Sequence, residues 1–253
     1  MDEKILTVAP ANGAPAFTRA QWYRYVRWLR RIGPVRSLVH FAIALEQMLR
    51  DPWASPQSFH QEFARAFDPW DYQASPIERA RFATAISMLD GARGGTRFRC
   101  AFEIGCAEGA FTELLAPRCG HLLAVDAADL ALERVRTELP RFQNVTFARW
   151  DLRRDPVLGG FDLIVAMDVL DCIFRPLVLR AVCAKLITAL SPDGLLLVTD
   201  PRQSEIFESA WWARPMLRGG KRILEFLARD ARLIKLGSEQ NDTHVFGLFR
   251  KRP

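Results

Sequence analysis

The chain has 253 residues, of which 49% are hydrophobic and 25% are charged, and its formal net charge is +6. This composition is ordinary for a globular protein and excludes collagen-like, low-complexity and disordered classes. No apolar run approaches the roughly 18 residues that a membrane helix needs, and no secretory signal is visible, so we expect a cytoplasmic location. The five cysteines lack a CxxC spacing, which argues against both a disulfide framework and a zinc site, so no metal is expected.

The basic charge is concentrated near the N-terminus. Residues 1–60 contain 8 Lys and Arg against 4 Asp and Glu, whereas the other 193 residues contain 27 against 25. The larger part of the chain is therefore almost neutral and lacks the basic stripe that phosphate contacts require. We do not expect nucleic acid as a partner.

Residues 1–57 are predicted to form a helical extension. A capping box at Thr18 and a Gly33-Pro34 stop bracket a helix with tryptophan and arginine on different faces, and a second amphipathic helix follows. Basic, aromatic helices of this kind bind anionic membrane surfaces, but they also pack against a second copy of the chain or against their own domain. The sequence leaves these alternatives open for residues 18–50, and the oligomeric state is unknown.

Residues 58–95 are predicted to form a helical cap. Phenylalanines at helical spacing indicate a short helix around Phe63, and the turn-rich segment 68–72 follows it. Ser75 begins a second capping box, with proline at the first helical position. The helix that it opens is expected to stop at Asp90-Gly91.

Residues 96–253 alternate short apolar runs with helical patterns. Such an alternation indicates βαβ units that build a buried parallel sheet. The last two runs are joined only by a polar loop around Asn241, so we expect them to pair as an antiparallel hairpin. The fold class is therefore α/β, a Rossmann-like doubly wound sheet with a helical N-terminal extension. The predicted strands include residues 100–104, 122–125, 145–148, 161–167, 195–198, 231–236 and 245–249.

A glycine-containing turn stands where the first strand passes into a helix. From Glu103 to Gly109 it reads EIGCAEG. A dinucleotide-binding GxGxxG turn would require glycine-like residues at Gly105, Ala107 and Ala110. The chain instead has Gly105, Ala107 and Gly109, with an acid two residues before the first glycine. This order resembles the ExGxGxG pattern of S-adenosylmethionine-dependent methyltransferases, in which the glycines keep Cβ atoms out of the space that the ligand fills.

Three acids follow the predicted strands in chain order. In the methyltransferase interpretation, Glu103 faces the cationic methionine end of the ligand. Asp126 ends the second strand and accepts hydrogen bonds from both ribose hydroxyls. Asp151 follows the third strand and accepts from the adenine amino group, while the backbone N–H of Leu152 donates to the ring. The carboxyl ends of parallel strands meet at one edge of a sheet, so we expect these groups to share one site.

From about residue 59 onward the chain resembles the class I methyltransferases and, more narrowly, the NodS family of nodulation N-methyltransferases. The resemblance rests on DPWDY at 68–72 with Ser75 and Glu78, on EIGCAEGAFTE at 103–113, and on FDLIVAMDVL at 161–170. It implies a seven-stranded sheet whose last strand is antiparallel, and S-adenosyl-L-methionine as the cofactor. It further implies methyl transfer to an amine of a small or sugar-like acceptor, as NodS-type enzymes methylate deacetylated chitooligosaccharides.

Residues next to these motifs complete the predicted cofactor site. Within and beside the motifs, Cys106, Ala127 and Met167 are expected to line it. Trp70 and Tyr72 are expected either to close over the cofactor, to pack against an acceptor sugar ring, or to hold the cap against the core.

Asp168 and Asp171 follow the fourth strand, at the edge where the acceptor would react. An amine needs a free lone pair to accept a methyl group, so a neighbouring carboxylate is useful. We therefore predict both as catalytic residues, with the alternative that Asp171 caps the next helix. DNA amino-methyltransferases carry an Asp/Asn-Pro-Pro-aromatic turn here, whereas this chain has MDVL. A small-molecule O-methyltransferase, a non-catalytic binding protein and, more remotely, a dehydrogenase remain alternatives.

Overall fold

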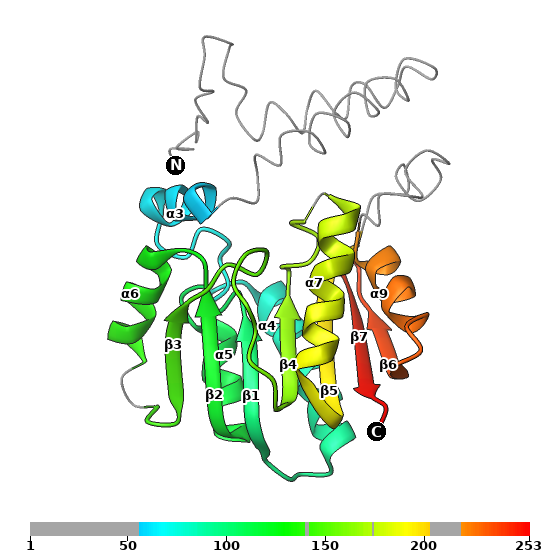
Figure 1. The fold of residues 1–253 in the computed structure, drawn as a ribbon. Helices are drawn as coiled ribbons and strands as arrows, with labels where there is room; N and C mark the ends of the chain where they lie inside the picture. The colour runs from blue at the N-terminus through cyan, green and yellow to red at the C-terminus, as the bar shows by residue number, and fades with distance from the viewer. Residues whose placement is uncertain (1–55, 140–141, 174, 203–218) are drawn as a thin grey trace, which may run out of the picture. The chain divides into compact units, whose positions relative to one another are not determined.

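The computed structural model describes residues 56–139, 142–173, 175–202 and 219–253 (Figure 1). The predicted N-terminal helices, and the contact expected through residues 18–50, lie outside the described residues. The three-part division at residues 57 and 95 stays a prediction. The described residues build one sheet with helices on both of its faces (Figure 1).

The sheet has seven strands in the order β3-β2-β1-β4-β5-β7-β6. Strands β1 to β5 pair in parallel, and β7 runs antiparallel to both β5 and β6. The predicted doubly wound sheet with an antiparallel last strand is therefore confirmed. The strands are β1 (Phe98–Ile104), β2 (Cys119–Asp126), β3 (Val145–Arg149), β4 (Phe161–Met167), β5 (Leu190–Pro201), β6 (Leu233–Gln240) and β7 (His244–Lys251).

Two apolar layers hold the helices against the sheet. Side chains alternate along a strand, so Ala101 of β1 packs in one layer and Phe102 in the other. One layer includes residues of α4, α5 and α6, and the other includes residues of α7 and α9. The described helices are α3 (Pro56–Arg65), α4 (Pro76–Arg93), α5 (Ala110–Leu115), the 3-10 helix η1 (Ala116–Arg118), α6 (Asp129–Glu138), α7 (Pro176–Ala189) and α9 (Gly220–Ala228).

Helix α4 starts as predicted but runs further. The Ser75 hydroxyl accepts the N–H of Glu78, and Pro76 occupies the first turn. The predicted stop at Asp90-Gly91 is wrong, because the helix continues to Arg93 and is capped by Gly94 at φ 61°. Gly91 lies inside the helix, and a Cβ there would meet nothing within 4 Å, so no neighbour requires a glycine at this position.

The order of strands places the topological switch point between β1 and β4. Ligands of doubly wound sheets bind outside the carboxyl ends of the strands at such a point. The loops that follow β1, β2, β4 and β5 therefore lie at the edge of the sheet where a ligand would bind. Among the described helices, none has the length and apolar character that crossing a membrane would require.

Candidate active site

The glycine turn after β1 has an unusual backbone. Gly105, Ala107 and Gly109 all have positive φ, at 75°, 48° and 89°. The N–H groups of Gly105 and Cys106 both donate to the carbonyl of Val125 on β2, at 2.8 and 3.0 Å. Since a non-glycine residue rarely adopts positive φ, the turn at Ala107 is held in a strained shape by its surroundings.

The two glycines are required by the protein's own packing. A Cβ on Gly109 would lie 2.5 Å from Cγ2 of Val135 in α6, and a Cβ on Gly105 would lie 2.7 Å from Cγ2 of Val169 after β4. We expected these glycines to make room for a ligand, but the structure shows that they also let α6 and the β4 loop approach the turn. The turn, α6 and the β4 loop thus form one compact unit.

Glu103 is buried beneath this turn. Its Oε2 accepts the hydroxyl of Thr112 in α5 at 2.8 Å. Burial raises the pKa of Glu103 to about 8, with a smaller contribution in the same direction from Asp126, while the Thr112 hydrogen bond opposes the shift. A buried acid of this kind favours a cation nearby, because a cation stabilises its ionised form.

Asp126 joins the turn to the end of β2. Its two carboxylate oxygens accept the N–H groups of Ala107 and Ala128, at 3.0 and 2.8 Å. Burial raises the pKa of this carboxyl, and the backbone hydrogen bonds oppose that shift. A carboxylate has about four acceptor positions, so two remain for further donors such as vicinal hydroxyls.

Asp151, predicted to contact adenine, is 6% exposed. Its Oδ1 accepts the N–H of Arg153 at 2.9 Å, whereas its Oδ2 has no hydrogen-bond partner among the described residues. Nε of Arg154 lies 3.8 Å from Oδ2, and Nε of Arg153 lies 3.5 Å from Oδ1. A buried acceptor atom without a donor costs free energy, so an amino group supplied by a ligand would be stabilised here. Leu152 is buried beside it.

Trp70 and Tyr72 form an aromatic layer over the glycine turn. Their rings stack at 5.9 Å, and the edge of the Trp70 ring meets Phe63 of α3 at 5.1 Å. They pack with Ala107 and with Ala128, which follows Asp126. Both aromatics are half-buried, so they close over the two loops that carry the predicted cofactor residues.

An ion pair missed by the sequence analysis fastens the cap to the turn. Glu108, in the glycine turn, accepts from Arg134 of α6 at 2.6 Å and from the N–H of Asp68 at 2.8 Å. The same guanidinium donates to the carbonyls of Phe63 and Ala66. One arginine thus joins α6, the turn and the C-terminal end of α3.

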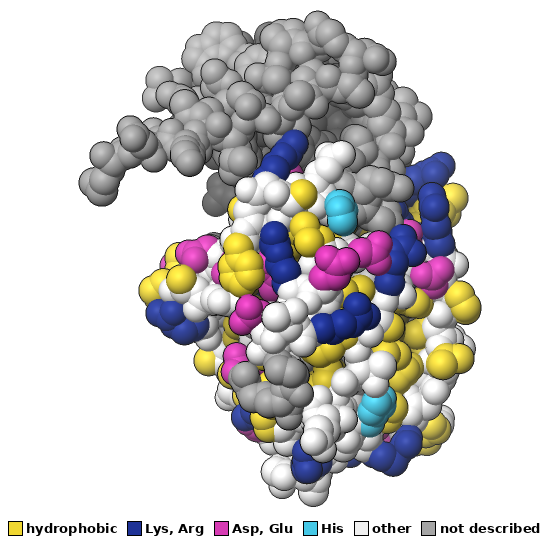
Figure 2. Space-filling model, turned by 90° about the vertical axis from the view of Figure 1, so that its left-hand side faces the viewer, with side chains coloured by type: hydrophobic (Ala, Val, Ile, Leu, Met, Phe, Trp, Pro, Cys, Tyr) yellow, Lys and Arg dark blue, Asp and Glu magenta, His cyan; other side chains and the backbone are white. Residues whose placement is uncertain are grey.

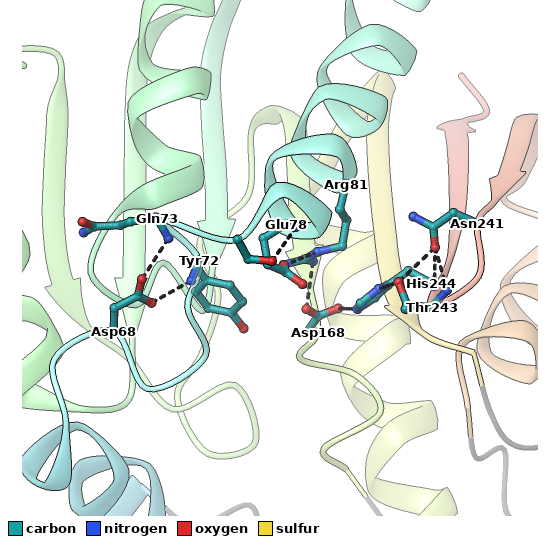
Figure 3. Close-up of polar contacts among 10 residues, drawn as sticks. Asp68, Tyr72, Gln73, Glu78, Arg81, Asp168, Asn241, Thr243 and His244 are labelled. Atoms are coloured by element: carbon teal, nitrogen blue, oxygen red, sulfur yellow. Dashed lines mark hydrogen bonds and ion pairs between the residues drawn. The ribbon is translucent and has the colours of Figure 1, made fainter. Parts of the chain in front are cut away.

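Asp168 lies in a network of charged side chains (Figure 3). Its Oδ2 contacts Nη1 of Arg81 at 2.8 Å, and its Oδ1 contacts Nε2 of His244 at 3.3 Å. Arg81 is only 1% exposed and also pairs with Glu78. Its guanidinium lies 5.5 Å from the centre of the Tyr72 ring. The carboxylate of Asp168 thus lies between side chains of α4 and β7, although its Oδ1 has no hydrogen-bond partner among the described residues.

The rest of this network fixes the imidazole of His244. Its Nδ1 lies 2.9 Å from the hydroxyl of Thr243, which is itself 3.1 Å from Oδ1 of Asn241 (Figure 3). The backbone of Asp168 has φ 54°, and its N–H donates to the carbonyl of Thr199 at 2.7 Å. The strained conformation of Asp168 is thus maintained by contacts from three neighbouring elements.

Asp171 lies three residues further along the same loop. Its N–H donates to Oδ1 of Asp200 at the end of β5, at 3.3 Å. Helix α7 begins at Pro176 with Arg175 at its N-cap, so the alternative that Asp171 caps this helix is wrong. The two catalytic candidates therefore differ, since Asp168 is paired with Arg81 and contacts His244, whereas Asp171 lies beside another acid.

The sequence held a signal for one of the missed residues. Asp200 ends β5 just as Asp126 ends β2, and the rule that acids at strand ends gather at the ligand edge applies equally to it. No comparable signal marked Arg81 or His244, because a helix arginine and a strand histidine are usually surface or core residues.

Comparisons with known proteins agree with this geometry. The sheet order and the glycine turn define the fold of the class I methyltransferases. The model of the Nodulation protein S (NodS) family matches residues 54–245, and the chain belongs to this family. Its relatives include the Nodulation protein S of Bradyrhizobium diazoefficiens, 34% identical over 135 residues, which are 53% of this chain and 63% of that protein.

A second relative and a solved structure extend the comparison. The Nodulation protein S of Rhizobium tropici is 33% identical over 148 residues, 58% of this chain and 60% of that protein. The match thus spans somewhat less than two thirds of these relatives. The crystal structure of the N-methyltransferase NodS from Bradyrhizobium japonicum WM9 in complex with S-adenosyl-L-homocysteine superposes with a TM-score of 0.67 at 26% identity, covering 79% of this chain and 100% of that one.

Proposed function

We propose that this protein is an S-adenosyl-L-methionine-dependent methyltransferase that methylates an amine of a small or sugar-like acceptor. The observation that carries the proposal is the joining of the positive-φ glycine turn to Asp126 at the switch point of the sheet. The NodS protein from Bradyrhizobium japonicum, which has the same fold, was crystallised with S-adenosyl-L-homocysteine and is described as an N-methyltransferase.

The described residues fit such a cofactor at three places. Asp126 keeps acceptor positions for the ribose hydroxyls, and the unpartnered Oδ2 of Asp151 suits the adenine amino group, with Leu152 beside it. Glu103 supplies a buried carboxyl for the methionine end. The remaining predicted contacts are Gly105, Cys106, Ala107, Gly109, Ala127, Met167, Trp70 and Tyr72.

The bound cofactor supplies a methyl group on a sulfonium, which is already a good leaving group. The protein's part is then alignment and exclusion of water. The Trp70–Tyr72 layer covers the turn, and the β4 loop brings Asp168 and Asp171 to the same edge. We propose that Asp168, held by Arg81 and His244, fixes the wall of the acceptor site, and that Asp171 faces the acceptor.

Surface charge favours a small acceptor over nucleic acid. On the face shown in Figure 2, the basic and acidic side chains of the described residues are interspersed, with no continuous basic stripe. Binding to a nucleic acid backbone depends on such a stripe. A cytoplasmic location and a contact through residues 18–50 stay proposals.

Methyl transfer to a defined acceptor tests the proposed function. The full chain is incubated with methyl-labelled S-adenosylmethionine and a partially deacetylated chitooligosaccharide, with the fully N-acetylated oligosaccharide as the matched control. We expect label in the deacetylated sugar alone. Label in the N-acetylated sugar would indicate transfer to oxygen, and cofactor binding without transfer to a panel of amines would indicate a binding protein.

A further inference from the structure

Two acids at the carboxyl ends of neighbouring strands lie against each other beside the glycine turn. Asp171 follows β4 and Asp200 lies near the end of β5, and the N–H of Asp171 donates to Oδ1 of Asp200 at 3.3 Å. Two carboxyl groups held this close favour a shared proton, because two adjacent negative charges are unfavourable.

Asp200 is the buried member of this pair. Its side chain is 0% exposed, and its Oδ2 has no hydrogen-bond partner among the described residues. It lies close to the start of α9, where a Cβ on Gly220 would be 2.9 Å from the Asp200 Cβ. A buried acceptor oxygen without a donor is unfavourable unless a ligand brings one. Among basic groups, an ammonium is suited to this place because it brings three donors and a positive charge.

The pair also lies beside the proposed cofactor site. Val169 directly follows Asp168 and lies two residues before Asp171, and a Cβ on Gly105 would be 2.7 Å from Cγ2 of Val169. Asp171 is half-buried, so it is the member of the pair that a ligand can reach. Asp168 is less suited to this role, because its Oδ2 pairs with the Arg81 guanidinium and its Oδ1 lies 3.3 Å from Nε2 of His244.

We propose that Asp171 and Asp200 together bind the ammonium group of the acceptor and take its proton before methyl transfer. This inference rests on the proposed function. The ammonium N–H bond breaks and an O–H bond forms on the Asp171 carboxylate, which leaves a neutral amine. The freed lone pair then forms the N–C bond while the S–C bond breaks and its electrons remain on sulfur. The product ammonium and the carboxyl pair later lose their protons to water.

The charges around the pair strengthen its affinity for a proton. Burial raises the pKa of Asp200 well above its usual range, and the charges of Asp171 and Asp168 raise it further. Burial raises the pKa of the Cys172 and Cys183 thiols, and the charge of Asp200 raises both further. A single aspartate in water has a pKa far below that of an ammonium and is therefore a weak base toward it. The raised pKa of this buried pair lies closer to the pKa of the ammonium, which favours the proton transfer.

Substitution of either acid tests the proposal. We compare wild type, Asp200→Asn and Asp171→Asn, with Asp193→Asn as the control, since Asp193 is an exposed acid in the turn at the start of β5. Binding of S-adenosylhomocysteine by each variant reports whether the cofactor site is intact. With the deacetylated sugar as acceptor, we expect kcat to fall at least about tenfold in both site variants, with cofactor affinity unchanged. In a plot of kcat against pH, the fall of kcat on the acid side is expected to occur at lower pH in Asp200→Asn than in wild type. A purely structural role would not produce this shift.

A second measurement does not depend on the acceptor. Carbon-13 NMR of aspartate-labelled wild-type protein is expected to show a carboxyl that titrates well above the ordinary aspartate range and whose titration is absent from Asp200→Asn but kept in Asp193→Asn. If no such carboxyl titrates, or if the site variants match the control in kcat and pH profile, the proposal is wrong. If the wild-type protein does not bind S-adenosylhomocysteine, the result would instead contradict the proposed function.

Discussion

Asp126 is the residue whose loss should most affect the cofactor. Replacing it by alanine removes a charged acceptor from the proposed ribose contact and two bonds within the loops. Hydrogen bonds to charged groups contribute about 1.5–3 kcal/mol each, so calorimetry should show at least about a tenfold weaker affinity for S-adenosylhomocysteine. Asp129→Ala, an exposed acid in the first turn of α6, is the control. Unchanged affinity in Asp126→Ala would contradict the ribose assignment.

Glu103 should make stability depend on pH. Its pKa in the folded protein is about 8, against an ordinary value of 4.5, so the native state keeps a proton that the unfolded chain has lost. The contribution of Glu103 to the free energy of unfolding is therefore complete below pH 4.5. It decreases as the pH rises toward 8, by up to about 1.4 kcal/mol per pH unit. Urea unfolding of Glu103→Gln should therefore depend less on pH than that of wild type or of the exposed-site control Glu133→Gln. Parallel curves for Glu103→Gln and wild type would show that Glu103 ionises normally.

At the scale of single elements, two glycines should respond in opposite ways to alanine. Gly109 has φ 89° and no room for a Cβ next to Val135, so Gly109→Ala should destabilise the protein by about 2 kcal/mol or more. Gly91 lies within α4 with nothing within 4 Å, so Gly91→Ala should stabilise it by about 0.5–1 kcal/mol. Thermal unfolding checks both, and equal effects would contradict the described packing of the glycine turn.

The attachment of α3 to the rest of the molecule should depend on Arg134. Replacing it by alanine removes its bonds to Glu108 and to the carbonyls of Phe63 and Ala66, and it leaves a buried carboxylate without its cation. We expect a loss of about 1–3 kcal/mol and faster amide exchange in α3. Arg136→Ala, which removes an exposed arginine of the same helix, should leave α3 exchange unchanged. Equal exchange in the two variants would refute this role.

Across the whole molecule, the centre of the sheet was predictable because its strands β1, β4, β5 and β7 are largely buried on both faces. Such strands appear in the sequence as continuous apolar runs, and the short polar loop around Asn241 allowed only an antiparallel pair. The end of α4 was not predictable, because a glycine within a helix costs only about 0.5–1 kcal/mol, which the packing of the helix can outweigh. Gly91 is such a residue, and the true cap is Gly94.

A site residue was predictable where its position at the carboxyl end of a strand is enough to place it at the ligand-binding edge of the sheet. Glu103, Asp126 and Asp151 follow that rule, and Asp200 would have followed it too. Arg81 and His244 were not predictable, because their burial depends on a partner far away in the sequence, the carboxylate of Asp168. A buried arginine is stable only when paired, and pairing is a property of the folded chain.

Binding of S-adenosylhomocysteine to the full chain tests the central claim most directly. Titration calorimetry on wild-type protein should show saturable binding at one site per chain, and NADH should give no heat in the same experiment. The account predicts this result because the glycine turn, Asp126 and Asp151 form one site at the switch point of the sheet. Absence of binding by both S-adenosylhomocysteine and S-adenosylmethionine to folded protein would contradict it.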